Sequence, residues 1–162
     1  MKMFLKYLKM KKNKYYSELS INFHYDDKAI ISFYHTARNL FAQGNKTNTF
    51  VNDGNLIMVT NQDIKECVSK IINDRIQNQY LIEHLMIFKK LGNIIEKGRL
   101  VNQTYENKNR HKYVTWNYYY SGINIAGVLY DLEFDVVSRI DGQNHYRVHR
   151  IKKADIQSTL PN

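Results

Sequence analysis

Hydrophobic residues recur every three or four positions in three separate stretches of the chain, which is the spacing of one helix face. The first stretch covers residues 26–43 and ends before Gly44, and the second covers residues 61–75. The third covers residues 79–97 and ends before Gly98. Because glycine is common just after the end of a helix, the pattern predicts three helices.

Other stretches alternate between apolar and polar residues, which is typical of strands with one buried face. In residues 128–136 every second side chain is apolar, while Asp131, Glu133 and Asp135 occupy the opposite face. The sequence Asn52–Gly54 is typical of a tight hairpin turn. The predicted strands are residues 18–25, 50–51, 56–60, 112–120, 123–137 (bent or split at Gly127) and 145–152, with further turns at Ser121–Gly122 and Asp141–Gly142.

The order of these elements predicts one α+β domain, in which helices pack on one face of a C-terminal antiparallel sheet. The chain has 162 residues, a usual length for a single domain. Hydrophobic residues make up 43% of the chain and aromatic residues 13%, so a folded core is expected. The sequence contains no internal repeat and no linker rich in Pro, Gly or Ser.

The net charge of +9 is concentrated at the N-terminus. Residues 1–14 contain six lysines and no acidic residue, so the remaining 148 residues carry 18 basic and 15 acidic side chains. This basic arm suits binding to a polyanion, and a solvated chain end explains it equally well. Lys6 and Lys9 interrupt its apolar residues, so it lacks the continuous core of a secretion signal. We also find no run of about 18 apolar residues that would predict a membrane span.

The single cysteine, Cys67, excludes an internal disulfide and a cysteine-based zinc cluster, and it fits a reducing compartment. The sequence lacks a Gly-rich phosphate loop, an H-E-x-x-H zinc motif and a G-x-S-x-G nucleophile motif. We therefore expect no cofactor, and we do not expect nucleotide hydrolysis by a P-loop or zinc hydrolysis by the usual motifs.

Four motifs follow one another between residues 56 and 153. They are a strand ending in MVTNQDIKE, paired helices ending in FKKLGNIIEKGRL, the stretch NRHKYVTWNYYYSG and a hairpin closing in HYRVHRI. This succession resembles the barnase–EndoU–colicin–RelE (BECR) nuclease superfamily, and in particular its polyvalent-protein-associated branch of phages and mobile elements. The residues that match the motifs of that branch are Thr60, Ile64, Lys65, Leu91, Ile94, Ile95 and Gly98. The resemblance implies helices packed on a four-stranded antiparallel sheet, with metal-independent RNA cleavage as the ancestral activity.

Metal-independent RNA cleavage requires a general base, a general acid and a cation near the phosphate. The last predicted strand supplies such groups, because alternation places His145, Arg147 and His149 on one face and Tyr146 on the other. The alternative is an exposed, charged edge strand that discourages aggregation. The candidates for nucleic-acid contacts on the same strand are Arg150 and Lys152.

The stretch ENKNRHKYVTWNYYYSG, residues 106–122, joins basic residues to a run of aromatic residues. A basic loop beside exposed rings suits single-stranded nucleic acid, because bases stack on the rings while phosphates meet the cations. The same aromatic residues are also favoured as strand formers that pack well across strands. The candidates are His111 for catalysis and Lys108, Arg110, Lys112 and Tyr119 for nucleic-acid binding.

Two further positions carry possible chemistry. His84 lies at the edge of the apolar stripe of the third helix, where it can oppose the last strand, although a buried histidine with a hydrogen-bond partner is the commoner outcome. Glu133 is a candidate base if the last strand lies beside it. The alternative for its acidic row is cross-strand pairing with Arg147 and Arg150, and metal binding by this row has weaker support.

We divide the chain into a basic arm (1–14), an extension of unknown role (15–55), a BECR-like α+β domain (56–153) and a tail (154–162). The resemblance implies an RNase-like domain of a phage or mobile element, which binds and cleaves RNA in the cytoplasm of a bacterial host. The alternative is a non-enzymatic phage protein of the anti-defence or anti-CRISPR type. Such a protein would bind a host defence protein or nucleoprotein complex through its tyrosines and arginines, which are favoured at interface hot spots.

Overall fold

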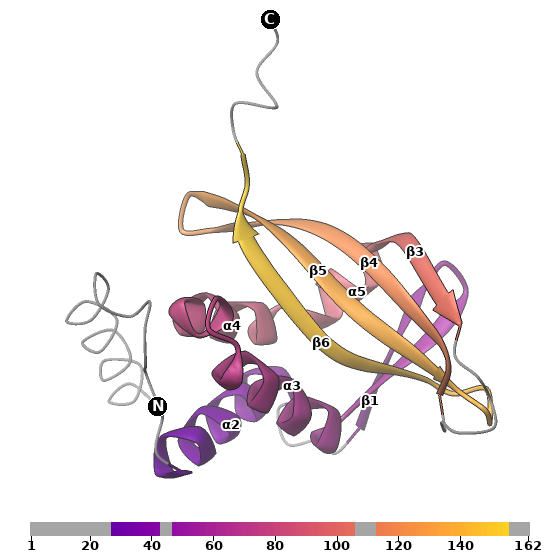
Figure 1. The fold of residues 1–162 in the computed structure, drawn as a ribbon, viewed down its shortest axis with the longest axis horizontal. Helices are drawn as coiled ribbons and strands as arrows, with labels where there is room; N and C mark the ends of the chain where they lie inside the picture. Colours follow the sequence, from indigo (N-terminus) through magenta and orange to yellow (C-terminus); the bar gives the residue numbers. More distant parts are fainter. Residues whose placement is uncertain (1–26, 43–46, 106–112, 156–162) are drawn as a thin grey trace, which may run out of the picture.

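The computed structural model describes residues 27–42, 47–105 and 113–155. In this part of the chain the helices gather on one side of a six-stranded sheet that curls into a half-barrel (Figure 1). This arrangement confirms the α+β class. The predicted strand at residues 18–25, the basic arm and the tail from residue 156 onward lie outside the described residues.

The helices begin close to the positions that the hydrophobic spacing predicts. They are α2 (Asp27–Ala42), α3 (Asn61–Asn73), the 3₁₀ helix η1 (Gln77–Tyr80), α4 (Leu81–Lys89) and α5 (Leu91–Lys97). Thr60 caps α3, because its hydroxyl accepts a hydrogen bond from the N–H of Asp63 while the Asp63 carboxylate accepts one from the N–H of Thr60. Within the described ranges, no helix has the length and apolar character needed to cross a membrane.

Two of the predicted turns, at Asn52–Gly54 and Asp141–Gly142, connect strands of the sheet, although Asn52 itself is the last residue of β1. Asp53 and Gly54 have positive φ angles of 48° and 79°, and Gly142 donates its N–H to the carbonyl oxygen of Arg139. The strands are β1 (Thr47–Asn52), β2 (Asn55–Thr60), β3 (Arg99–Tyr105), β4 (Tyr113–Ile125), β5 (Val128–Arg139) and β6 (Asn144–Lys153).

One prediction about the C-terminal strands is wrong, and one strand is not predicted. Ser121 and Gly122, expected as a turn, lie inside β4, and the chain turns instead at Ala126 and Gly127, both with positive φ. The hydrophobic pattern also fails to predict β3. All seven of its residues are exposed, so β3 lacks the alternation of buried and solvated side chains that identifies the other strands.

The prediction of one helix over residues 79–97 is also wrong, because the helix breaks at Lys90 into α4 and α5. Gly92 lies two residues after the break. A Cβ at this position would lie only 2.4 Å from Cε1 of Phe50, so α5 approaches β1 more closely than another residue would allow. The two helices pack on different elements, α4 on α2 and α5 on β1.

The sheet is mixed rather than purely antiparallel, with the strand order β1-β2-β6-β5-β4-β3. Strands β3 to β6 form the expected antiparallel meander. Strand β2 pairs parallel to β6, with Ile57 and Met58 opposite Asn144 and His145. The two strands are parallel because the chain crosses the sheet three times, in β3, β4 and β5, between the helices and β6. The expected antiparallel sheet, and the four strands that the resemblance implies, are therefore corrected to six strands with one parallel pair.

The described part of residues 15–55 packs with the rest of the fold. Strand β1 pairs with β2 along its length, and α2 contacts α3 and α4. Phe33 and Ala37 of α2 are buried in the same core as the residues of α3, α4 and the sheet. These residues therefore complete the layer of helices that covers one face of the sheet.

The core lies between the helices and the inner face of the sheet, and Phe134 of β5 lies within it. The ring of Tyr119 stacks on Phe134 with centroids 5.0 Å apart, and a Cβ at Gly98 would lie 2.5 Å from Cζ of Phe134. The largest fully buried side chains are Tyr146, Phe33, Phe88, Phe134, Ile57, Ile64, Ile71, Leu85, Ile87, Leu91, Ile95 and Leu132.

Asn52 provides a test of how the first hairpin is attached. Its buried amide donates to the carbonyl oxygens of Ile95 (2.7 Å) and Gly98 (2.7 Å), so it satisfies the end of α5. We predict that Asn52→Ala lowers the free energy of unfolding by about 1–3 kcal/mol, because these buried carbonyls lose their donor. Urea unfolding would measure this change. Asn55→Ala, an exposed asparagine of the same hairpin, is the matched control, and an equal loss in both variants would contradict the role of Asn52.

Candidate functional site

One edge of β6 is covered by helices rather than by a strand along most of its length. Strand β2 pairs only with Asn144 and His145, and α3 and η1 pack against the remainder. Gln77 of η1 acts in place of a strand partner. Its Oε1 accepts a hydrogen bond from the N–H of Ile151 (2.8 Å), and its Nε2 donates to the carbonyl oxygen of Ile151 (3.0 Å). These bonds satisfy backbone groups that would otherwise be buried without a partner.

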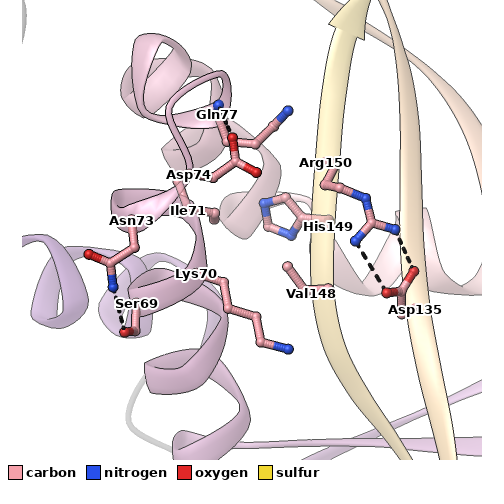
Figure 2. Close-up of a pocket in the computed structure, with 10 residues that line it drawn as sticks. All are labelled: Ser69, Lys70, Ile71, Asn73, Asp74, Gln77, Asp135, Val148, His149 and Arg150. Carbon is pink, nitrogen blue, oxygen red and sulfur yellow. Dashed lines mark hydrogen bonds and ion pairs between the residues drawn. The ribbon is translucent and has the colours of Figure 1, made fainter. Parts of the chain in front are cut away.

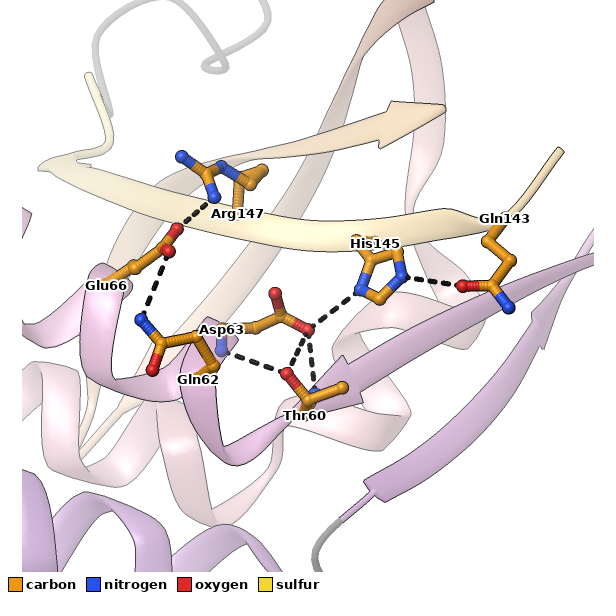
Figure 3. Close-up of polar contacts among 7 residues, drawn as sticks. All are labelled: Thr60, Gln62, Asp63, Glu66, Gln143, His145 and Arg147. Atoms are coloured by element: carbon orange, nitrogen blue, oxygen red, sulfur yellow. Dashed lines mark hydrogen bonds and ion pairs between the residues drawn. The ribbon is translucent and has the colours of Figure 1, made fainter. Parts of the chain in front are cut away.

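Three residues of β6 that the sequence analysis singles out all meet α3. His145 contacts Asp63, Arg147 forms an ion pair with Glu66, and His149 contacts Cys67, and the first two of these contacts are drawn in Figure 3. Alternate residues of β6 therefore meet the N-terminal half of α3.

His145 ties β6 to the first turn of α3 (Figure 3). Its Nδ1 lies 3.2 Å from Oδ2 of Asp63 and its Nε2 lies 3.3 Å from Oε1 of Gln143. The same Asp63 oxygen also accepts hydrogen bonds from the N–H and the hydroxyl of Thr60. The imidazole is 4% exposed, and both of its nitrogens hold structural elements together.

A β-bulge changes the alternation of side chains along β6. The register with β5 makes Arg147 the extra residue of the bulge. As a result Tyr146 and His149 lie on the same side of the strand, where the Tyr146 hydroxyl contacts Nδ1 of His149. The expectation that Tyr146 faces away from His149 is therefore wrong.

His149 and His84 stack on one another inside the protein. Their ring centroids are 4.9 Å apart, their planes meet at 29°, and both side chains are fully buried. Phe88 packs edge-on against the same His149 ring. His84 therefore faces the last strand, as its place beside the apolar stripe suggests, and it forms part of the core.

Burial keeps both imidazoles neutral. It lowers the pKa of His84 to about 3 and that of His149 well below its ordinary value, with His84 and Arg150 adding to the effect on His149. Because the Ile151 backbone fixes the orientation of the Gln77 amide, Nε2 of His84, 3.1 Å from Oε1 of Gln77, carries the proton. Burial also raises the pKa of the Cys67 thiol to about 12, so this thiol is not an activated nucleophile.

A pocket of about 420 Å³ lies between the C-terminal half of α3 and β6 (Figure 2). Its apolar wall is formed by Ile71 and Val148 together with the His149 ring. Its polar lining residues are Ser69, Lys70, Asn73, Asp74, Gln77, Asp135 and Arg150. Burial, with a contribution from Arg147, lowers the pKa of Lys70. Two basic and two acidic residues line this pocket, so its charges balance.

A second group of polar residues lies on the outer face of the sheet, the face opposite Phe134. Tyr120, Glu133 and Arg150 lie directly opposite one another on β4, β5 and β6, and we call these three residues the outer row. Neighbouring strands are about 4.8 Å apart, so the row spans roughly 10 Å from the first Cα to the last. Arg150 donates to both oxygens of Asp135 (3.2 and 2.7 Å) and to Glu133 (3.3 Å).

The outer row is accessible to solvent. The side chains of Glu133 and Arg150 are 52% and 37% exposed, and Tyr120 is 36% exposed. The hydroxyl of Tyr120 donates to Oδ1 of Asp131 (2.6 Å), and this bond raises the pKa of Tyr120, so the phenol keeps its proton at neutral pH. The row therefore presents a carboxylate, a guanidinium and a protonated phenol side by side. Tyr120 is not a candidate on the sequence alone, because no local signal gives the register of β4 against β5.

The other candidates from the sequence lie in different surroundings. Tyr119 is 5% exposed and its ring belongs to the core, whereas Lys152 is exposed opposite Asp131. The expected pairing of the acidic row with Arg150 is confirmed, but Arg147 pairs with Glu66 instead. The candidates Lys108, Arg110, His111 and Lys112 lie outside the described residues. Where side chains are described, no group of three or more His, Cys, Asp or Glu residues is arranged to hold a metal ion.

Comparison with known proteins gives one relevant finding. The sequence profile of the family described as large polyvalent protein-associated domain 3 matches residues 32–146. No curated protein and no solved structure matches the chain. The matched region begins within α2, includes α3, Tyr120 and Glu133, and ends in β6 shortly before Arg150. It confirms the polyvalent-protein context that the resemblance implies.

The buried histidine pair predicts how stability depends on pH. Because the pKa of His84 is lowered in the folded state, the unfolded chain binds a proton at His84 below about pH 6.5 and the folded protein does not. The contribution of the neutral His84 to the free energy of unfolding is complete above that pH and is lost as the pH falls toward 3. We predict that one such group lowers the free energy of unfolding by about 2 kcal/mol between pH 7 and pH 5.

Urea unfolding of His84→Leu at pH 5 and pH 7 would measure the contribution of this group. Between pH 7 and pH 5 the free energy of unfolding of the variant is expected to fall by about 2 kcal/mol less than that of the wild type, because the variant has no imidazole at this position to protonate. His35→Leu, which removes an exposed histidine of α2, is the matched control and should behave as the wild type. Equal pH dependence in all three proteins would contradict the neutral, buried state of His84.

Proposed function

The chain belongs to the large polyvalent protein-associated domain 3 family, a domain associated with large polyvalent proteins of phages and mobile elements, and from this premise we propose that it is a metal-independent RNA-cleaving domain whose active site is the outer row. The observation that carries the proposal is the register of β4, β5 and β6, which aligns Tyr120, Glu133 and Arg150. A base, a cation and a proton donor are the groups that this reaction requires. The BECR resemblance supports the same reaction class.

Each member of the outer row has one task. The Glu133 carboxylate takes the proton of a ribose 2′-hydroxyl, and the 2′-oxygen attacks the neighbouring phosphorus. The guanidinium of Arg150 faces the negative charge that develops on the phosphate. Tyr120 gives its phenolic proton to the leaving 5′-oxygen. The products are a 2′,3′-cyclic phosphate and a 5′-hydroxyl, and the proton on Glu133 returns to Tyr120 through solvent.

The contacts of Arg150 fit the entry of a phosphate. Its bond to Glu133 joins two partly exposed side chains, and such a pair contributes roughly 0–1 kcal/mol. A phosphate can therefore replace Glu133 on the guanidinium, and the freed carboxylate then acts as the base. Asp135, whose side chain is 7% exposed, keeps its two bonds to Arg150 and holds the guanidinium in place. Arg99, 5.8 Å from the centre of the Tyr120 ring, adds positive charge beside the row.

In this proposal the histidines of β6 have a supporting role. His145 and His149 lie between β6 and α3, so they hold the strand that carries Arg150. Arg147 does the same through Glu66. From the sequence, these three residues are candidates for the acid, the base and the phosphate-binding cation. The supporting role replaces those direct roles. It is favoured because neither imidazole faces the solvent on the outer side of the sheet.

A second candidate function is binding without cleavage. Trp116 and Tyr118 alternate with core residues on β4 and lie on the same outer face as Tyr120 and Arg99. Tyrosine, tryptophan and arginine are the residue types that most often dominate protein interfaces. The acidic side chains of β5 also make this face less favourable for a polyanion than a purely basic one. The partner that this alternative implies is a host defence protein or nucleoprotein complex, which an anti-defence protein would bind.

Incubation of the protein with labelled single-stranded RNA in EDTA tests the first function. We predict cleavage that leaves 2′,3′-cyclic phosphate ends, and a rate at least 100-fold lower in Glu133→Gln, because the amide cannot take the 2′-proton. The matched control is Glu96→Gln, which changes an exposed glutamate of α5 and should leave the rate unchanged.

The outcomes separate the two functions. Cleavage at the same rate in the wild type and Glu133→Gln would remove the outer row from the reaction. If folded wild-type protein cleaves neither this RNA nor structured RNA, RNA cleavage is refuted and binding without cleavage becomes the favoured function. Thermal melting of each variant shows whether a lost rate reflects lost chemistry or a lost fold.

A further inference from the structure

We propose that the pocket between α3 and β6 is a nucleobase subsite, which receives the base of the nucleotide whose phosphate lies on Arg150. The inference rests on the proposed function, because Arg150 belongs both to the outer row and to the lining of the pocket. A nucleotide held by this guanidinium has the pocket on one side and Glu133 and Tyr120 on the other. The pocket therefore lies where a neighbouring base would be placed.

The wall of the pocket suits the face of an aromatic ring. Ile71 and Val148 are buried apolar side chains, and the fully buried His149 ring, which is stacked on His84, completes this apolar floor of the pocket (Figure 2). Nε2 of His149 has no hydrogen-bond partner within the described ranges. Single-stranded nucleic acids are commonly recognised by packing of the base against such surfaces, combined with hydrogen bonds to its edge.

The rim of the pocket offers both donors and acceptors. Oδ1 of Asp74 already accepts hydrogen bonds from the N–H groups of Ile76 (2.8 Å) and Gln77 (3.0 Å), which leaves Oδ2 for an amino or imino group of a base. The amide of Asn73 can donate and accept. The ammonium of Lys70 forms no ion pair within the described residues, so it can donate to a carbonyl oxygen of a base. A base edge has this same mixture of donors and acceptors.

The charge of the pocket favours a neutral base over a simple anion. Asp74 and Asp135 balance Lys70 and Arg150, so a free phosphate gains little net attraction. The pocket also lies beside the last turn of α3, where the negative end of the helix dipole disfavours an anion. Its volume of about 420 Å³ falls within the range of pockets that bind small molecules, about 300–1,000 Å³.

Calorimetric titration with the four nucleoside 3′-monophosphates, in EDTA, tests the subsite without relying on cleavage. We expect one base to bind more tightly than the others. Lys70→Met, which keeps the length of the side chain but removes its charge, should raise the dissociation constant of that nucleotide by about 10-fold or more. Asn73→Ala should reduce the preference among the four bases. Lys65→Met changes an exposed lysine of the same helix that does not line the pocket, and it should bind as the wild type does.

The possible results separate this inference from the proposed function. If Glu133→Gln cleaves RNA normally but Lys70→Met still weakens nucleotide binding, the nucleobase subsite stands and the outer-row mechanism fails. If cleavage depends on Glu133 but Lys70→Met and Asn73→Ala change neither nucleotide binding nor base preference, the subsite is refuted. Inorganic phosphate that binds as tightly as the nucleotides, with the same loss in Lys70→Met, would refute it too, because the pocket would then be an anion site.

Discussion

The unpaired edge of β6 is the constraint on which much of the fold depends. Strand β2 covers only two of its residues, so the remaining backbone groups and side chains must find partners among helices. The Gln77 side chain provides both a donor and an acceptor for Ile151, and α3 provides partners for three alternate side chains of the strand. A buried polar group left without a partner costs more than a typical hydrogen bond contributes, and these contacts therefore set the position of α3 on the sheet.

The same constraint explains why residues that look catalytic in the sequence lie in the interior. His145 is used by Asp63 and Gln143, and His149 lies between Cys67, Tyr146 and His84. Burial then keeps His84 and His149 neutral. On the outer face of the sheet Arg150 is accessible and held in place by Asp135, and it links the outer row to the pocket beside α3. The residues on the inner side of the strand thus stabilise the fold, and Arg150 on its outer side faces the proposed RNA ligand.

The position of Arg150 gives the proposed function and the proposed subsite a common physical basis. A guanidinium fixed by a buried carboxylate loses little freedom when it binds a second anion, and its weaker contact with the exposed Glu133 is the one that a phosphate can replace. The nearly balanced charge around it limits non-specific attraction to polyanions. Contacts to a base in the pocket would therefore contribute to selection of a substrate, since long-range charge contributes little.

Local features of the sequence determined the parts of this protein that depend on local physics. Helical spacing gave the position of α2 and the start of α3, and turn-forming residues gave the hairpins at Asp53–Gly54 and Asp141–Gly142. Motifs in the last hundred residues gave the polyvalent-protein context. Only the tertiary structure decided the break at Lys90, near which Gly92 allows the close approach of Phe50 to α5. It also decided the parallel pairing of β2 with β6, the burial of His149 and the register that aligns Tyr120 with Glu133. These features depend on which distant elements meet, and a periodic pattern of apolar residues shows which face of an element is buried but not what buries it.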